Sequence, residues 1–113
     1  MNEREPMEPS LDVRVDPGSR TVRLAGELDM ASVDRLLGAV LPLAERGGDL
    51  LVELRDLEFM DSSGLGGLFR VAASLRGGDR LQLLEPRPPV RRVLELVGGC
   101  GMHPGIVVLD RPA

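Results

Sequence analysis

The apolar residues of this sequence change their spacing along the chain, and three Gly-Gly pairs mark where a helical spacing ends. Up to Leu24 apolar and polar residues alternate, which is the two-residue period of a half-buried strand. After Asp29 the apolar residues recur every three or four positions, as on one face of a helix. Each Gly-Gly pair is followed by a short, nearly continuous apolar run, which is typical of a buried strand. The pattern therefore predicts an α/β chain.

The predicted elements follow the order ββαβαβαβ. The first two strands, at 11–15 and 22–24, are expected to form an antiparallel hairpin. Asp16-Pro17-Gly18-Ser19 between them suits a type II turn with Gly18 at positive φ. Later strands reached through helical crossovers lie parallel in the same sheet, so the sheet is mixed. The remaining expected elements are a helix at 33–44 that Pro42 interrupts, a strand at 50–54, a helix capped by Asp61 or Ser62, a strand at 81–84, a helix opened by Pro88-Pro89 and a strand at 106–109.

The 113 residues suffice for one domain with one core. Residues 1–10 hold charges and prolines without an apolar period, so we expect a disordered segment followed by one domain over 11–113. Leu, Val and Ala must fill the core, because the chain has no Trp or Tyr and only two Phe. The charged N-terminus is unlike a signal peptide, and no apolar run approaches the ~18 residues of a membrane span. A cytoplasmic protein without a membrane partner is expected.

The net charge of -4 argues against nucleic acid as a direct partner, because phosphate binding needs a basic face. All basic residues are Arg, so no lysine can serve as a Schiff base or a P-loop cation. The single cysteine, Cys100, excludes an internal disulfide. His103 lies close to it, but a metal site would need further ligands from elsewhere, so a solvated loop and no cofactor are expected. A serine hydrolase would need Gly-x-Ser-x-Gly and a paired histidine, so an enzyme is not expected.

Residues 56–67 join the predicted strand at 50–54 to the next helix. In α/β folds, ligands and partners meet the sheet at such loops beyond the carboxyl ends of strands. Gly64, Gly66 and Gly67 fall in the first turns of the helix, where each costs roughly 1 kcal/mol relative to Ala. Either the helix start packs closely against its neighbours, or an outside group approaches its backbone.

Two adjacent hydroxyls stand at the start of this helix. Asp61, Ser62 and Ser63 form a good capping sequence, but two serines exceed what one cap requires. Met60 and Leu65 would frame these hydroxyls with apolar groups suited to a partner. The segment is therefore a candidate binding site for another protein.

Phe59-Met60-Asp61-Ser62-Ser63-Gly64-Leu65-Gly66 resembles the signature of bacterial anti-sigma factor antagonists. These belong to the STAS family, which is named for sulfate transporters and anti-sigma factor antagonists. Gly26-Glu27-Leu28-Asp29 is similar to a second recurrent element of the family, and the element order matches over about 11–109. The resemblance implies a STAS-like fold and a partner-switching function.

In this family the unphosphorylated antagonist binds an anti-sigma factor that is also an ATP-dependent serine kinase, and the sigma factor is freed. Phosphorylation ends the binding, and a serine phosphatase resets the antagonist. The resemblance implies that Ser63 is the acceptor, with Ser62 as the alternative. Ser62 would otherwise cap or orient, and Asp61 would shape the loop. The implied partner-binding residues are Glu27, Asp29, Met60, Asp61, Ser62, Ser63, Gly64, Leu65 and Gly66.

Glu27 and Asp29 are two carboxylates at the end of the second strand. As a metal site they lack further ligands nearby. Asp29 is either a helix cap or, together with Glu27, a contact for Arg or Lys on the anti-sigma factor. The alternative function for the whole chain is a STAS-like interaction module of a transport, lipid-trafficking or sensory complex that has no sigma-factor partner.

Overall fold

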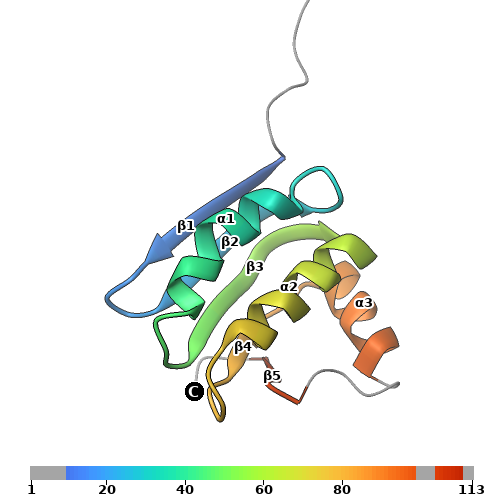
Figure 1. Cartoon of the computed structure of the whole chain (residues 1–113). Coiled ribbons are helices and arrows are strands. Elements are labelled where there is room, and N and C mark those ends of the chain that lie inside the picture. The colour runs from blue at the N-terminus through green and yellow to red at the C-terminus, as the bar shows by residue number, and fades with distance from the viewer. Residues whose placement is uncertain (1–9, 99–103, 111–113) are drawn as a thin grey trace, which may run out of the picture.

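The computed structural model describes residues 10–98 and 104–110 (Figure 1). Cys100 and His103, which were expected in a loop, lie outside the described residues, as do residues 1–9. The elements follow the predicted order ββαβαβαβ. They are β1 (Leu11–Asp16), β2 (Thr21–Leu28), α1 (Val33–Ala44), β3 (Leu50–Met60), α2 (Ser62–Ser74), β4 (Leu81–Leu84), α3 (Pro88–Gly98) and β5 (Ile106–Leu109).

The strands form one mixed sheet in the order β1-β2-β3-β4-β5. β1 and β2 pair antiparallel as the predicted hairpin, and every later pair is parallel. Helices α1 and α2 lie side by side on one face of the sheet, with α3 next to α2 (Figure 1). Val22 and Leu24 are buried beneath these helices, while Arg23 between them is exposed on the other face. The two-residue period of β2 thus separates core from solvent, as predicted.

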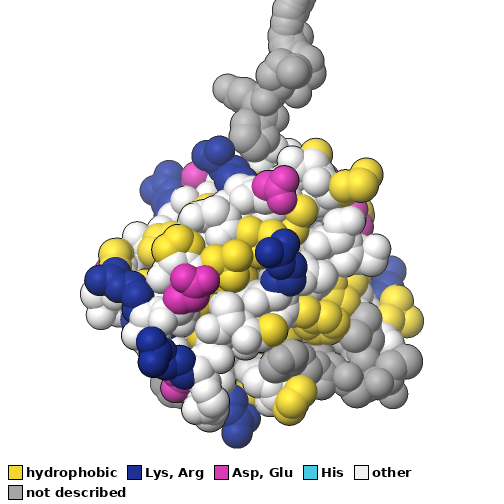
Figure 2. Space-filling view, viewed as in Figure 1, with side chains coloured by type: hydrophobic (Ala, Val, Ile, Leu, Met, Phe, Trp, Pro, Cys, Tyr) yellow, Lys and Arg dark blue, Asp and Glu magenta, His cyan; other side chains and the backbone are white. Residues whose placement is uncertain are grey.

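The core is almost wholly aliphatic, as the composition requires. Leu36 and Val40 of α1, Leu68 of α2 and Leu54 of β3 are all fully buried. On the face seen in Figure 2, hydrophobic side chains show between the two helices, with positive and negative side chains interspersed. This face carries no continuous basic patch of the kind that binds phosphate backbones.

Strand β3 is longer than predicted, and the expected loop at its carboxyl end is wrong. The strand runs to Met60, because its pairing with β2 continues through Ala25 opposite Asp56 and Leu28 opposite Met60. The pairing shifts register twice on the way, so the buried residues fall every third position at Leu54, Leu57 and Met60. A bulged strand loses its simple alternation, which is why this half of β3 resembled a loop in the sequence.

The hairpin turn is also not the predicted type II turn. Among the described residues Gly18 is absent from the positive-φ positions, whereas Arg20 has φ 54°. The Asp16 carboxylate accepts hydrogen bonds from the backbone N–H of Gly18 at 3.1 Å and of Ser19 at 3.4 Å. Such an Asx turn directs the chain locally, and the left-handed residue then falls two positions later.

The unusual backbone of Arg20 places its guanidinium against the end of α1. It donates hydrogen bonds to the carbonyl oxygens of Leu43 at 3.0 Å, Gly48 at 2.9 Å and Asp49 at 2.9 Å. The last carbonyls of a helix lack partners within the helix. Arg20 therefore ties the end of α1 and the loop that follows it to the start of β2, at the amino-terminal end of the parallel strands.

Candidate functional site

Helix α2 begins immediately after β3, and Asp61 is its N-cap. Asp61 has an extended backbone, and its Oδ1 accepts a hydrogen bond from the N–H of Gly64 at 3.0 Å. Its own N–H donates to the carbonyl oxygen of Leu28 at 3.2 Å. Of the two predicted cap residues, the structure selects Asp61. This cap ties the start of α2 to the end of β2.

Ser62 and Ser63 are the first two residues of α2. Ser62 is exposed and Ser63 is half-buried. Within the part of the chain that the structure describes, neither hydroxyl makes a hydrogen bond, and the capping role considered for Ser62 belongs to Asp61. Both hydroxyls are thus left unengaged at the positive end of a helix.

The three glycines of this helix differ in their surroundings. A Cβ at Gly64 would lie 2.5 Å from the carbonyl oxygen of Leu28, and one at Gly67 would lie 2.5 Å from Cγ2 of Val33. A Cβ at Gly66 would meet no atom within 4 Å. Close internal packing, the first of the two predicted alternatives, therefore accounts for Gly64 and Gly67 but not for Gly66.

Met60 and Leu65 do not frame the serines at the surface, so that prediction is wrong. Their side chains are only 1% and 4% exposed, because β3 continues to Met60 and turns it toward α2, while Leu65 lies on the inner face of the helix. The exposed apolar side chains at this end are Phe59 at 45% and Met30 at 77%. The sequence did contain a signal for Met30, since it belongs neither to the period of β2 nor to that of α1.

The Gly26-Glu27 step of the second motif lies opposite a bulge in β3, where Glu58 is the extra residue between Leu57 and Phe59. Gly26 has φ 100°, and a Cβ there would lie 2.0 Å from the carbonyl oxygen of Ser10. That oxygen accepts a hydrogen bond from the N–H of Glu27 at 3.0 Å. The Glu27 side chain is exposed, in register with Phe59 on β3.

Asp29 shapes the turn between β2 and α1 and is not the N-cap of α1. Its Oδ1 accepts from the N–H of Ala31 at 3.0 Å and of Ser32 at 3.1 Å. Ser32, in the N-cap position, is only 1% exposed, and its hydroxyl donates to the carbonyl oxygen of Glu27 at 2.8 Å. The prediction that Asp29 caps the helix is therefore wrong. Ser32 is the N-cap, because it directly precedes Val33, and Asp29 stabilises the turn that leads to it.

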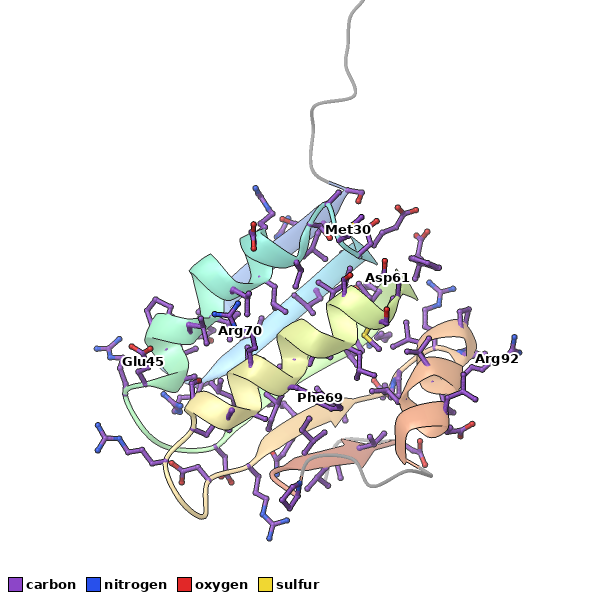
Figure 3. All side chains as sticks on the ribbon, turned by 45° about the vertical axis from the view of Figure 1, so that its right-hand side comes forward. Met30, Glu45, Asp61, Phe69, Arg70 and Arg92 are labelled. Carbon is purple, nitrogen blue, oxygen red and sulfur yellow. The ribbon has the colours of Figure 1, made fainter. Side chains whose placement is uncertain are left out.

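The turn at 29–32 lies beside the start of α2. Leu28, on one side of the turn, touches the Gly64 position, and Val33, on the other side, touches the Gly67 position. Figure 3 shows Met30 and Asp61 at the same end of the molecule. The structure therefore brings Glu27 and Asp29 of the Gly-Glu-Leu-Asp motif to the same edge as Ser62 and Ser63.

Within residues 10–98 and 104–110, no three His, Cys, Asp or Glu side chains gather as they would around a metal ion. No helix in the described part combines the length and the apolar character needed to span a membrane.

Comparisons with known proteins find one family model and several relatives in curated proteins. A family model described as "Mlab, STAS domain" matches residues 11–104. The anti-sigma-B factor antagonist of Bacillus subtilis is 35% identical over 92 residues, which cover 79% of this chain and 83% of that protein. The anti-sigma F factor antagonist of Paenibacillus polymyxa is 33% identical over 84 residues, 72% of each chain.

Solved structures share the fold. A crystal structure of an anti-sigma factor antagonist from Mycobacterium paratuberculosis superposes with a TM-score of 0.73 at 24% identity, over 92% of this chain and 87% of the other. The structure of the anti-sigma factor antagonist SpoIIAA in its unphosphorylated form superposes with a TM-score of 0.66 at 25% identity, over 87% and 86% of the two chains.

Proposed function

The chain belongs to the STAS domain family, and we propose that it is an anti-sigma factor antagonist of the cytoplasm. In its unphosphorylated state it binds an anti-sigma factor that is also an ATP-dependent serine kinase, and this frees the sigma factor. The kinase phosphorylates Ser63, binding ends, and a serine phosphatase restores the first state. The names of the relatives support the antagonist role, and the geometry of α2 supports the position of the switch.

The observation that carries this proposal is that Asp61, and neither serine, caps α2. Asp61 caps α2 with its carboxylate and is held to Leu28 by its backbone. The hydroxyls of Ser62 and Ser63 are consequently not needed to start the helix. A modification of Ser63 leaves the cap and its hydrogen bonds in place.

A phosphate at this position changes the surface without disturbing the domain. The helix N-terminus carries a partial positive charge, which favours a nearby anion. A phosphoserine adds about -1.5 to -2 charges, beside the carboxylate of Asp61. At a contact that sheds water, like-charge opposition costs several kcal/mol, and each ~1.4 kcal/mol is a tenfold change in affinity. One phosphate therefore lowers affinity by about a hundredfold or more.

Glu27 supplies the acidic contact of the same surface. Its side chain is exposed next to Phe59, while the Oδ1 of Asp29 is occupied by two backbone N–H groups. Glu27 is the carboxylate that meets Arg or Lys on the anti-sigma factor, and Asp29 holds the turn in shape. The backbone of Gly64 and Gly66 and the hydroxyl of Ser62 complete the surface.

Phosphate mapping tests the switch. The full chain is incubated with its cognate anti-sigma kinase and ATP, and the modified residue is located by mass spectrometry. One phosphate at Ser63 is expected, with none in Ser63→Ala and an unchanged yield in Ser62→Ala. Modification of Ser62 in the unaltered chain, or of neither serine, contradicts the assignment.

A second function is favoured by the description of the family model, which names Mlab. It is a STAS-like interaction module of a transport, lipid-trafficking or sensory complex without a sigma-factor partner. Pull-down from the native host separates the two functions. Recovery of an anti-sigma factor supports the first, and recovery of transport subunits alone supports the second.

A further inference from the structure

Met30 is the most exposed of the large apolar side chains in the described part, at 77%. The turn that carries it is not loose. The carboxylate of Asp29 accepts two backbone hydrogen bonds within the turn, and the buried hydroxyl of Ser32 bonds the carbonyl oxygen of Glu27. An apolar side chain held out on an ordered turn loses little backbone entropy on binding, which is the property of an interface anchor.

Gly66 is the second feature at this end that the fold itself does not explain. It lies three residues after Ser63 and four after Ser62, so all three share one face of α2. Gly66 is half-buried, and a Cβ there would meet no neighbouring atom within 4 Å, so packing does not require glycine at this helix position, where alanine is more stable. Gly64 and Gly67, in contrast, are required by the close approach of Leu28 and Val33.

Met30 lies on the turn beside the start of α2, and Gly66 lies in the second turn of that helix. The turn at 29–32 runs along the first two turns of α2, because its flanking residues touch the Gly64 and Gly67 positions (Figure 3). Ser63 begins the helix face that leads to Gly66. A partner broad enough to cover this turn and the first two turns of α2 together with the Ser63 hydroxyl would also reach the thioether of Met30 and the helix backbone at Gly66.

We propose that Met30 and Gly66 are specificity-determining residues of the partner-binding surface. Met30 enters an apolar pocket of the anti-sigma factor, and the partner's chain packs directly on the backbone of α2 at Gly66. This inference rests on the proposed function, since it names how the same partner is held. It also places the phosphate of Ser63 at the edge of a water-free contact, where a charge is most unfavourable.

The anchor is tested with Met30→Ala and its matched control Leu96→Ala. Leu96 lies on α3 and is 71% exposed, so both substitutions remove a similar exposed apolar side chain. Calorimetric titration with the purified cognate anti-sigma kinase should show at least a tenfold loss of affinity for Met30→Ala and none for Leu96→Ala. The thermal unfolding midpoint of both variants should equal that of the unaltered chain.

The close approach is tested with Gly66→Ala and its matched control Gly38→Ala. Gly38 is an exposed glycine of α1, and as at Gly66 a Cβ there would meet no atom within 4 Å. Both substitutions should raise the unfolding midpoint, because alanine favours a helix. Only Gly66→Ala should weaken binding, by about tenfold.

The two levels of the proposal fail in different ways. If the unaltered chain does not bind the kinase, the proposed function is wrong. If it binds and either Met30→Ala or Gly66→Ala binds equally well, the function stands and this inference is overturned.

Discussion

The two ends of the parallel strands are closed by different means. At the amino-terminal end, side chains reach far along the sequence to bond backbone groups. Asp79 accepts from the N–H of Gly48 at 2.7 Å, and Asp49 accepts from the N–H of Arg80 at 2.8 Å, beside the three bonds of Arg20. At the carboxyl-terminal end the side-chain bonds of Asp29, Ser32 and Asp61 stay within five residues.

Glycine replaces those long-range bonds at the carboxyl-terminal end. Gly26, Gly64 and Gly67 let the chain approach Ser10, Leu28 and Val33 more closely than any side chain allows. Among the described residues, the hydroxyls of Ser62 and Ser63 then make no hydrogen bond within the fold. One end of the domain uses its charges for stability, and the other leaves the hydroxyls of Ser62 and Ser63 and the side chain of Met30 to the partner that we propose.

Gly64→Ala should have the largest effect on stability. The new methyl would lie 2.5 Å from the carbonyl oxygen and 2.7 Å from Cγ of Leu28, so β2 or α2 must move. We expect the free energy of unfolding in urea to fall by about 3 kcal/mol. Gly66→Ala is the control, because it should raise the same free energy by up to about 1 kcal/mol. Equal unfolding curves for the two variants would show that close packing of Gly64 against Leu28 does not stabilise this end of the domain.

Arg20→Ala should have the next largest effect on stability, and it acts at the amino-terminal end of the parallel strands. It removes three hydrogen bonds from a charged donor that is partly exposed, so we expect a loss of about 2 kcal/mol in the free energy of unfolding. Arg20→Lys should recover less than half, because an ammonium cannot reproduce the planar fork.

Arg14→Ala is the matched control for this end, since the Arg14 side chain is 77% exposed and its ion pair with Asp12 lies at the surface. A change within about 0.5 kcal/mol is expected there. Binding of the anti-sigma factor should be unaltered in all three arginine variants. A binding defect in Arg20→Ala at a temperature where it is folded would show that the two ends are coupled.

Asp61→Ala should cost about 1 kcal/mol, the usual loss of an N-cap. Asp61→Asn keeps an acceptor for the N–H of Gly64 and should lose only a few tenths. Unfolding followed by circular dichroism measures both. If Asp61→Ala is as stable as Asp61→Asn, a serine hydroxyl has replaced Asp61 as the cap. The idea that Asp61 leaves the hydroxyls of Ser62 and Ser63 without a structural role would then be wrong.

Much of this fold follows from local pattern. The alternation around Val22 and Leu24 and the helical stripe from Leu36 to Val40 each identify an element by period alone. The second half of β3 could not be identified in this way, because two register shifts against β2 break the alternation between Leu54 and Met60. The hairpin turn was misread because Arg20 adopts the positive φ that a turn pattern assigns to glycine.

The site was only partly predictable for a related reason. The two motifs contain Ser63 and Glu27, which the structure places at one edge, but the motifs could not say which side chains face inward. Met60 and Leu65 are buried because the strand reaches further than its pattern, whereas Met30 is exposed on a turn that no period describes. Likewise, three glycines look alike in sequence, and only the positions of Leu28 and Val33 separate Gly64 and Gly67 from Gly66.

Ser63→Asp should have the smallest effect on stability, and it tests directly whether this end of the domain accepts a negative charge without disturbing the fold. The carboxylate lies at the positive end of α2, so compared with Ser63→Asn it should raise the free energy of unfolding by about 0.5 kcal/mol. The same pair of substitutions at Ser74, the last residue of α2, should give the opposite sign, because a negative charge there opposes the helix dipole. Taking Asp against Asn at each position cancels the loss of the serine hydroxyl, including its bond to the carbonyl oxygen of Val71 at 2.7 Å. Both differences should shrink at high salt. A destabilised Ser63→Asp would mean that a negative charge at this surface disturbs the fold, and phosphate would then act by unfolding the helix start instead of by repelling the partner.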